Sequence, residues 1–161
     1  DFPNATVNTA SATSVDVSVR DNTLSEPDPV QYIEFEDLDG VASVISVSAS
    51  DFVLTADNVV YIEVTDMAVK NCDQDLVSDA LCIITINGDP ADFDLSNAET
   101  ADNTAGTDTF HNFASTLEQK TLGTKSGSGI GKWRIFPEFR LTIPAITPPG
   151  DHAATITFSL T

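Results

Sequence analysis

The sequence predicts an all-β protein: an antiparallel two-sheet sandwich of the immunoglobulin-like or jelly-roll-like kind, with an extended N-terminal strand. Three observations lead to this expectation. Apolar residues alternate with polar ones in short runs, β-branched and aromatic residues dominate those runs, and Gly, Pro, Asn and Asp gather between them. A chain of 161 residues can bury a core of its own as one domain. Only residues 113–120 have a composition that could form even a short helix.

Seven extended segments are expected along the chain. In order they lie at 15–19, 30–35, 41–49, 59–64, 81–86, 133–143 and 156–160. The segment at 133–143 is the longest, and apolar residues occupy its alternate positions, which indicates that Trp133 belongs to the core. The preceding segment ends in the turn signal Asn87-Gly88. The longer connections at about 87–110 and 122–132 are expected to be surface loops.

The N-terminal segment extends the alternation of the first strand backwards. Small and β-branched residues occupy the odd-numbered positions from Ala5 to Thr13 and lead into Val15. About fifteen extended residues span up to ~50 Å, which is longer than one small sandwich needs. The segment therefore either bends between the two sheets of its own domain or leaves that domain to complete a sheet of a neighbouring copy. We assign residues 1–14 as an N-terminal extension and candidate donor strand, and 15–161 as a single sandwich domain. The expected subunit contacts are Phe2, Ala5, Val7, Thr9 and Ser11.

The charge of the chain limits its partners. With 25 acidic against 7 basic side chains, the formal net charge is -18, which argues against nucleic acid and anionic membrane surfaces as partners. No apolar run is long enough for insertion into a membrane. Residues 1–119 hold 23 acidic and 2 basic groups, whereas 120–161 hold 2 acidic and 5 basic groups. The split indicates either a solvated acidic surface or a head-to-tail electrostatic match between copies.

Cysteine usage and the first residues favour an exported protein. Cys72 and Cys82 close a short loop with no further Cys or His nearby to complete a zinc site, so a disulfide is expected, with two buried free thiols as the alternative. Such a loop closure stabilises a fold by roughly 2.5–3 kcal/mol in the chain-entropy account. The polar start Asp-Phe-Pro-Asn without Met is what a mature secreted chain would show.

Clustered carboxylates make calcium a possible ligand. Flexible loops rich in Asp supply the oxygen ligands that calcium prefers. The first candidate cluster stands before the turn residue Gly40 and consists of Glu34, Glu36, Asp37 and Asp39. A second consists of Asn87, Asp89, Asp92 and Asp94, and a third, within the cysteine loop, of Asp73, Asp75 and Asp79. The alternative for each cluster is a solvated acidic turn.

Catalysis is not expected. His111 and His152 stand on separate segments with no nucleophile motif beside either. The glycine-rich stretch 123–132 departs from the spacing of a phosphate-binding loop and no helix follows it.

Several stretches resemble a known family. The C-terminal stretches 122–133, 139–144 and 149–160, together with the central stretches 35–40 and 43–52, resemble WxL-type surface domains of Gram-positive bacteria. More broadly, they are similar to the β-sandwich subunits of bacterial and archaeal surface fibres. The two Trp-x-Leu motifs of that family would fall near Val44, where there is no Trp, and at 158–160, where Phe158 stands instead. The resemblance implies the sandwich rather than attachment to peptidoglycan.

These observations together predict a secreted, non-enzymatic structural subunit of an extracellular filament (a pilus-like fibre) or surface layer. Copies of the chain would form a homopolymer by N-terminal strand donation, and loop carboxylates would bind calcium. The alternative function is that of a monomeric cell-wall- or glycan-binding module at the cell surface.

Overall fold

The computed structural model describes residues 15–18, 33–71, 83–94, 110–126, 129–135 and 137–161. The all-β prediction is confirmed: the described strands pair antiparallel throughout, and two short 3₁₀ turns, η1 (Val64–Asp66) and η3 (Pro90–Asp92), join some of them. The strands are β1 (Val15–Ser18), β2 (Ile33–Asp37), β3 (Ser43–Ala49), β4 (Phe52–Leu54), β5 (Val59–Ile62), β6 (Met67–Asn71), β7 (Ile83–Asn87), β8 (Phe93–Asp94), β9 (His111–Asn112), β10 (Lys120–Lys125), β11 (Gly131–Ile135), β12 (Pro137–Ile143), β13 (His152–Ala153) and β14 (Ile156–Leu160).

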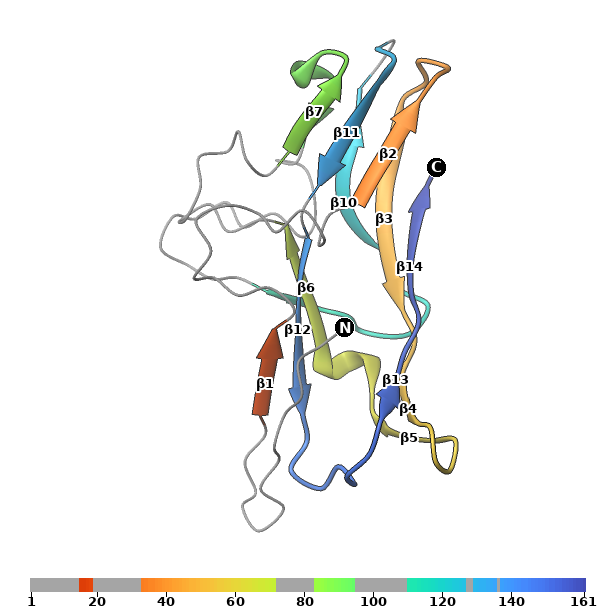
Figure 1. Ribbon diagram of the computed structural model, residues 1–161, viewed down its shortest axis with the longest axis vertical. Coiled ribbons are helices and arrows are strands. Elements are labelled where there is room, and N and C mark those ends of the chain that lie inside the picture. The colour runs from red at the N-terminus through yellow and green to blue at the C-terminus, as the bar shows by residue number, and fades with distance from the viewer. Residues whose placement is uncertain (1–14, 19–32, 72–82, 95–109, 127–128, 136) are drawn as a thin grey trace.

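The described strands group into two layers (Figure 1). In the first layer, the sheet β2-β11-β7 continues into the sheet β1-β12-β6-β9, because β11 and β12 follow each other almost without a break. In the second layer, the sheet β14-β3-β10-β8 continues into the sheet β13-β4-β5, because β4 follows β3 and β14 follows β13 along the chain. Consecutive strands thus connect the two halves of the molecule, β11 to β12 in the first layer and β3 to β4 and β13 to β14 in the second.

The core lies between these layers and follows the predicted alternation. Trp133 in β11 and Leu141 in β12 point inward from the first layer, and Val47 in β3 points inward from the second. Trp133 has no exposed surface and its ring stacks on Phe35 at a centroid distance of 5.5 Å, so its assignment to the core is confirmed. One continuous apolar cluster therefore serves both halves of the sandwich.

Several strand boundaries differ from expectation. The region 122–132 was expected to be a loop, but β10 runs to Lys125 and β11 begins at Gly131, so the described sheet enters it from both ends. β10 pairs with β3 across a register shift between Thr121 and Gly123, and this irregularity weakens the two-residue period in the sequence. The predicted strand at 59–64 ends at Ile62, where η1 takes over.

Some predictions concern residues outside the described ranges. These are the donor positions Phe2, Ala5, Val7, Thr9 and Ser11, the cysteines Cys72 and Cys82, and the acidic residues Asp73, Asp75 and Asp79. In the described part of the chain, no helix has the length and apolar character needed to cross a bilayer.

Candidate functional site

The first acidic cluster is arranged by the pairing of β2 with β11. In this register Glu34 stands opposite Arg134 and Glu36 opposite Lys132, whereas Asp37 stands opposite Gly131. Successive residues of a strand face opposite sides of the sheet. Glu34 and Glu36 therefore lie on the outer face, and Asp37 points into the sandwich.

On the outer face, the carboxylates meet basic residues of the C-terminal third. Lys132 Nζ lies 2.9 Å from Glu34 Oε1 and 3.9 Å from Glu36 Oε2. Arg134 donates from Nε to Glu34 Oε2 at 2.8 Å, and its Nη2 lies 2.8 Å from the same oxygen. Hydrogen bonds from Lys132 and then Arg134 hold the pKa of Glu34 below its usual value, and Glu34 raises the pKa of Lys132. The uneven distribution of charge made Lys132 and Arg134 candidates for contact with another copy, but both form ion pairs within their own molecule.

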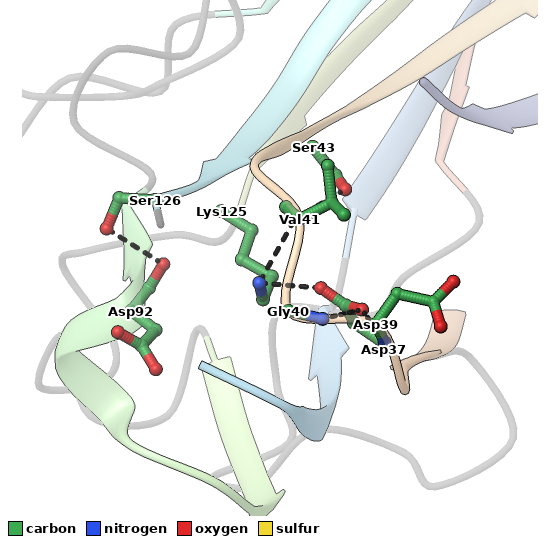
Figure 2. A network of polar contacts seen from close by, with 8 residues as sticks. All are labelled: Asp37, Asp39, Gly40, Val41, Ser43, Asp92, Lys125 and Ser126. Carbon is green, nitrogen blue, oxygen red and sulfur yellow. Dashed lines mark hydrogen bonds and ion pairs between the residues drawn. The ribbon is translucent and has the colours of Figure 1, made fainter. Parts of the chain in front are cut away.

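Asp37 forms a clamp at the end of the sandwich, shown in Figure 2. Its Oδ1 accepts hydrogen bonds from the backbone N–H groups of Asp39 at 2.8 Å and Gly40 at 3.0 Å, and Gly40 takes the left-handed backbone with φ 67°. Its Oδ2 lies 2.6 Å from Lys125 Nζ, which also donates to the carbonyl of Val41 at 3.1 Å. One carboxylate therefore shapes the turn after β2 and ties it to β10 in the opposite layer.

The clamp is largely removed from water. The Lys125 side chain has no exposed surface and that of Asp37 is 8% exposed. The Lys125 ammonium also lies 6.0 Å from the centroid of the Trp133 ring. The hydrogen bond from Lys125, followed by those from the Asp39 and Gly40 N–H groups, lowers the pKa of Asp37. At neutral pH the Asp37 carboxyl group is therefore ionised.

The four carboxylates of this cluster do not converge on one point. Glu34 and Asp37 lead to different cations on opposite faces of the sheet, and Figure 2 shows the Asp39 carboxylate directed away from Lys125. Among the described residues, no three His, Cys, Asp or Glu side chains come together in a way that could hold a metal ion. To bind these carboxylates, a calcium ion would have to displace Lys132 from Glu34 and Lys125 from Asp37.

The second acidic cluster is also built into turns. Asp89 Oδ1 accepts the N–H of Ala91 at 2.9 Å, and the N–H of Asp92 donates to the Asp89 carbonyl at 3.1 Å. The Asp92 carbonyl accepts the N–H of Ser126 at 2.8 Å and the Ser126 hydroxyl at 3.4 Å, the second drawn in Figure 2, which joins η3 to the end of β10. Asp94 pairs with Thr124 in the β8–β10 ladder, and Asn87 with Lys132 in the β7–β11 ladder. In this cluster the Asp89 carboxylate stabilises a turn, and the backbones of Asn87, Asp92 and Asp94 take part in turns and strand ladders.

The sequence did not predict a second buried ion pair. Lys70 Nζ lies 3.3 Å from Glu138 Oε2, with side-chain exposures of 0% and 2%. The two residues stand directly opposite each other on β6 and β12, and next to them Val69 and Phe139 face the core. Lys70 also lies 4.8 Å, and Arg140 4.3 Å, from the centroid of the Phe110 ring. The pair therefore covers the side of this sheet that faces away from the core.

The two histidines lie in different sheets. His111 is in β9 and His152 in β13. His152 Nε2 lies 3.1 Å from the Pro148 carbonyl, and its ring meets Tyr61 edge-on with 6.2 Å between centroids. These contacts place His152 in the packing of a loop against β5.

Comparison with known proteins gives no relative: no family model matches the chain, and no curated protein or solved structure matches it either. The resemblance to WxL-type and surface-fibre sandwiches therefore rests on the residues alone.

Proposed function

We propose that the protein is a structural subunit of an extracellular filament or surface layer, and that residues 1–13 of each copy form a strand in the next. The observation that carries this proposal is the position of β1. β1 stands at the end of the order β1-β12-β6-β9, so the chain that precedes it meets the sandwich at a sheet edge. An edge is where a segment can pass from one copy to another without breaking the sheet it leaves.

The net negative charge of the chain favours a contact between copies through a surface that carries no charge. A chain with a net charge of -18 repels its own copies, so association requires a surface on which that charge is absent. Residues 1–13 carry one ionisable side chain, Asp1, and alternate small and β-branched residues at odd positions. The described basic residues of the C-terminal third cannot readily supply the attraction, because Lys125, Lys132 and Arg134 are engaged within their own molecule.

The burial of Trp133 favours the structural role over a glycan-binding module. Sugar-binding surfaces commonly use exposed aromatic rings as stacking platforms, and the single tryptophan of this chain has no exposed surface. Two buried ion pairs, Lys125 with Asp37 and Lys70 with Glu138, would instead give the subunit a rigid body.

Negative-stain microscopy of the purified full chain tests the proposal. We expect filaments from the parent chain and from Asn8→Asp, which adds a charge at an even position that faces away from the donated face. The double variant Val7→Asp, Thr9→Asp adds charges to that face and should remain monomeric by light scattering. Filaments of normal length from the double variant, or a strictly monomeric parent that binds cell walls or glycans, would overturn the proposal.

A further inference from the structure

The two layers are unequal in the upper half of the molecule as drawn in Figure 1. Among the described strands, the second layer has four there, in the order β14-β3-β10-β8, and the first layer has three, in the order β2-β11-β7. Lys125 of β10 lies against the Trp133 ring of β11, which places these two strands face to face. In Figure 1 β2 then projects over β3, and β14 lies beyond both. The described first layer is one strand short opposite β14.

The side chains of β14 show the consequence. Ile156, Phe158 and Leu160 stand opposite Ala49, Val47 and Ile45 of β3, all of which are buried, so they point to the core side of the sheet. Phe158 is nevertheless 38% exposed and Leu160 47% exposed. Phe158 meets Phe139 of the first layer at 6.2 Å, whereas Leu160 lies at the far end of the strand. Core-facing apolar surface is thus left open to solvent along β14.

We infer that this opening, the β14 seam, is the acceptor for residues 2–13 of a second copy, which enter as the missing strand of the first layer. The inference rests on the proposed function and identifies the surface that receives the donated segment. A strand added beside β2 would lie over Phe158 and Leu160 and cover them, as β2 and β11 cover the strands opposite them.

The N-terminal segment fits the seam in length, shape and charge. Covering the five residues of β14 takes about 17 Å of extended chain. Residues 2–13 extend to about 40 Å, so chain remains to reach β1 of the donating copy. The odd-numbered residues Ala5, Val7 and Thr9 are small, which suits a space already occupied by the large Phe158 and Leu160 side chains. Residues 2–13 carry no ionisable side chain, so they bring no side-chain charge into the apolar site.

A second exposed edge supplies the rival site. β5 is last in the order β13-β4-β5, and Val59, Val60 and Tyr61 are exposed there. Val59 and Val60 are adjacent, so they lie on opposite sides of that short strand and form no single apolar face. The β14 residues, in contrast, are all on one side.

Four full-length variants test the inference. Leu160→Asp places a charge in the seam. Its matched control, Thr157→Asp, places the same charge on the outer side of β14, and Val60→Asp places it on the rival edge. We expect Leu160→Asp to abolish filaments and the two controls to form them. The donor-side double variant Val7→Asp, Thr9→Asp, whose seam is intact, should also form no filaments by itself.

Mixing the two defective chains gives the sharpest result. Leu160→Asp retains a working N-terminal segment, and the donor-side variant retains a working seam. Their mixture should therefore form a 1:1 dimer of twice the 17.1 kDa chain mass by light scattering, while each alone stays monomeric. Melting curves confirm that each variant is folded. If Leu160→Asp is not folded, Leu160→Thr, which keeps the strand preference, replaces it and should weaken assembly at least tenfold.

The outcomes separate the inference from the proposed function. Filaments from folded Leu160→Asp, or loss of filaments only in Val60→Asp, overturn the seam as acceptor, while the proposed function stands as long as the donor-side variant fails. Normal filaments from the donor-side variant overturn both. The mixed dimer supports both.

Discussion

Replacement of Lys125 by Met tests whether the clamp with Asp37 stabilises the fold. Lys125 links β10 in one layer to Asp37 and Val41 at the end of the other. Removal of one partner of a buried ion pair typically costs about 3–5 kcal/mol, because the other charge stays in a poorly solvated site. Asp37 would keep its two backbone N–H donors and is 8% exposed, so we place the loss for Lys125→Met near the lower limit, at about 2–3 kcal/mol.

Urea unfolding followed by Trp133 fluorescence measures this loss, since the only tryptophan lies beside the clamp. The matched control is Lys132→Met, which breaks the exposed pair with Glu34 and should shift the unfolding midpoint little. In the double variant Lys125→Met, Asp37→Asn neither charge remains, so its loss should be smaller than the sum of the single losses. If Lys125→Met shifts the midpoint no more than Lys132→Met does, the clamp does not hold the layers together.

Four further predictions follow from the same contacts. Because ion pairing lowers the pKa of Asp37, its stabilisation is complete above the usual aspartate pKa and is lost as pH falls through the lower folded value; acid-unfolding curves of Lys125→Met should be flatter there than those of the parent. A Cβ at Gly131 would overlap the backbone carbonyl of Asn87 and the Trp133 ring, so Gly131→Ala should lower the free energy of unfolding by about 1–3 kcal/mol in urea, whereas Gly129→Ala, whose Cβ would meet the movable Asp92 carboxylate, should cost less. Since Glu34 and Asp37 are already paired with lysines, calcium or EDTA should leave the melting temperature unchanged, and a calcium-dependent rise would restore the sequence-based calcium site. Filament growth, followed by turbidity, should rise with salt, because the contact is apolar and the bodies repel; a fall with salt would favour the head-to-tail electrostatic match.

The long core strands could be predicted from the sequence because their signal is local. Alternation from Trp133 to Ile143 is visible in the chain, and the structure gives β11 and β12 there with Trp133 buried. β4 and β13 have only three and two residues, too few to show a period, and no extended segment was expected at either. β10 carries a register shift and leads into a stretch rich in Gly and Ser, and that composition indicated a flexible connection.

The ionic contacts of Glu34, Asp37 and Glu138 could not be predicted, because each joins residues far apart in the chain. Glu34 and Arg134 are 100 positions apart and become neighbours only through the register of β2 on β11. In the sequence alone, where that register is not visible, the carboxylates before Gly40 resemble free oxygen ligands for a metal ion. The sequence predicted no buried partner for Lys70 or Lys125, although each lies within a strand. A lysine between apolar strand residues, as in Met67-Ala-Val-Lys-Asn71, was the available signal for a buried pair.

The net negative charge and the open β14 seam have opposite effects on association between copies. An apolar opening at a sheet edge is a hazard for a protein at high concentration, because unrelated strands can add to it. A net charge of -18 raises the cost of approach for every copy, and only a contact with enough apolar burial overcomes that repulsion. Residues 2–13 offer alternating small side chains with almost no charge, whereas other described edges carry acids beside their apolar residues, such as Asp57 next to β5. The same charge that limits random association would then favour contact through this uncharged segment, and donation from each copy to the next would give the filament a direction.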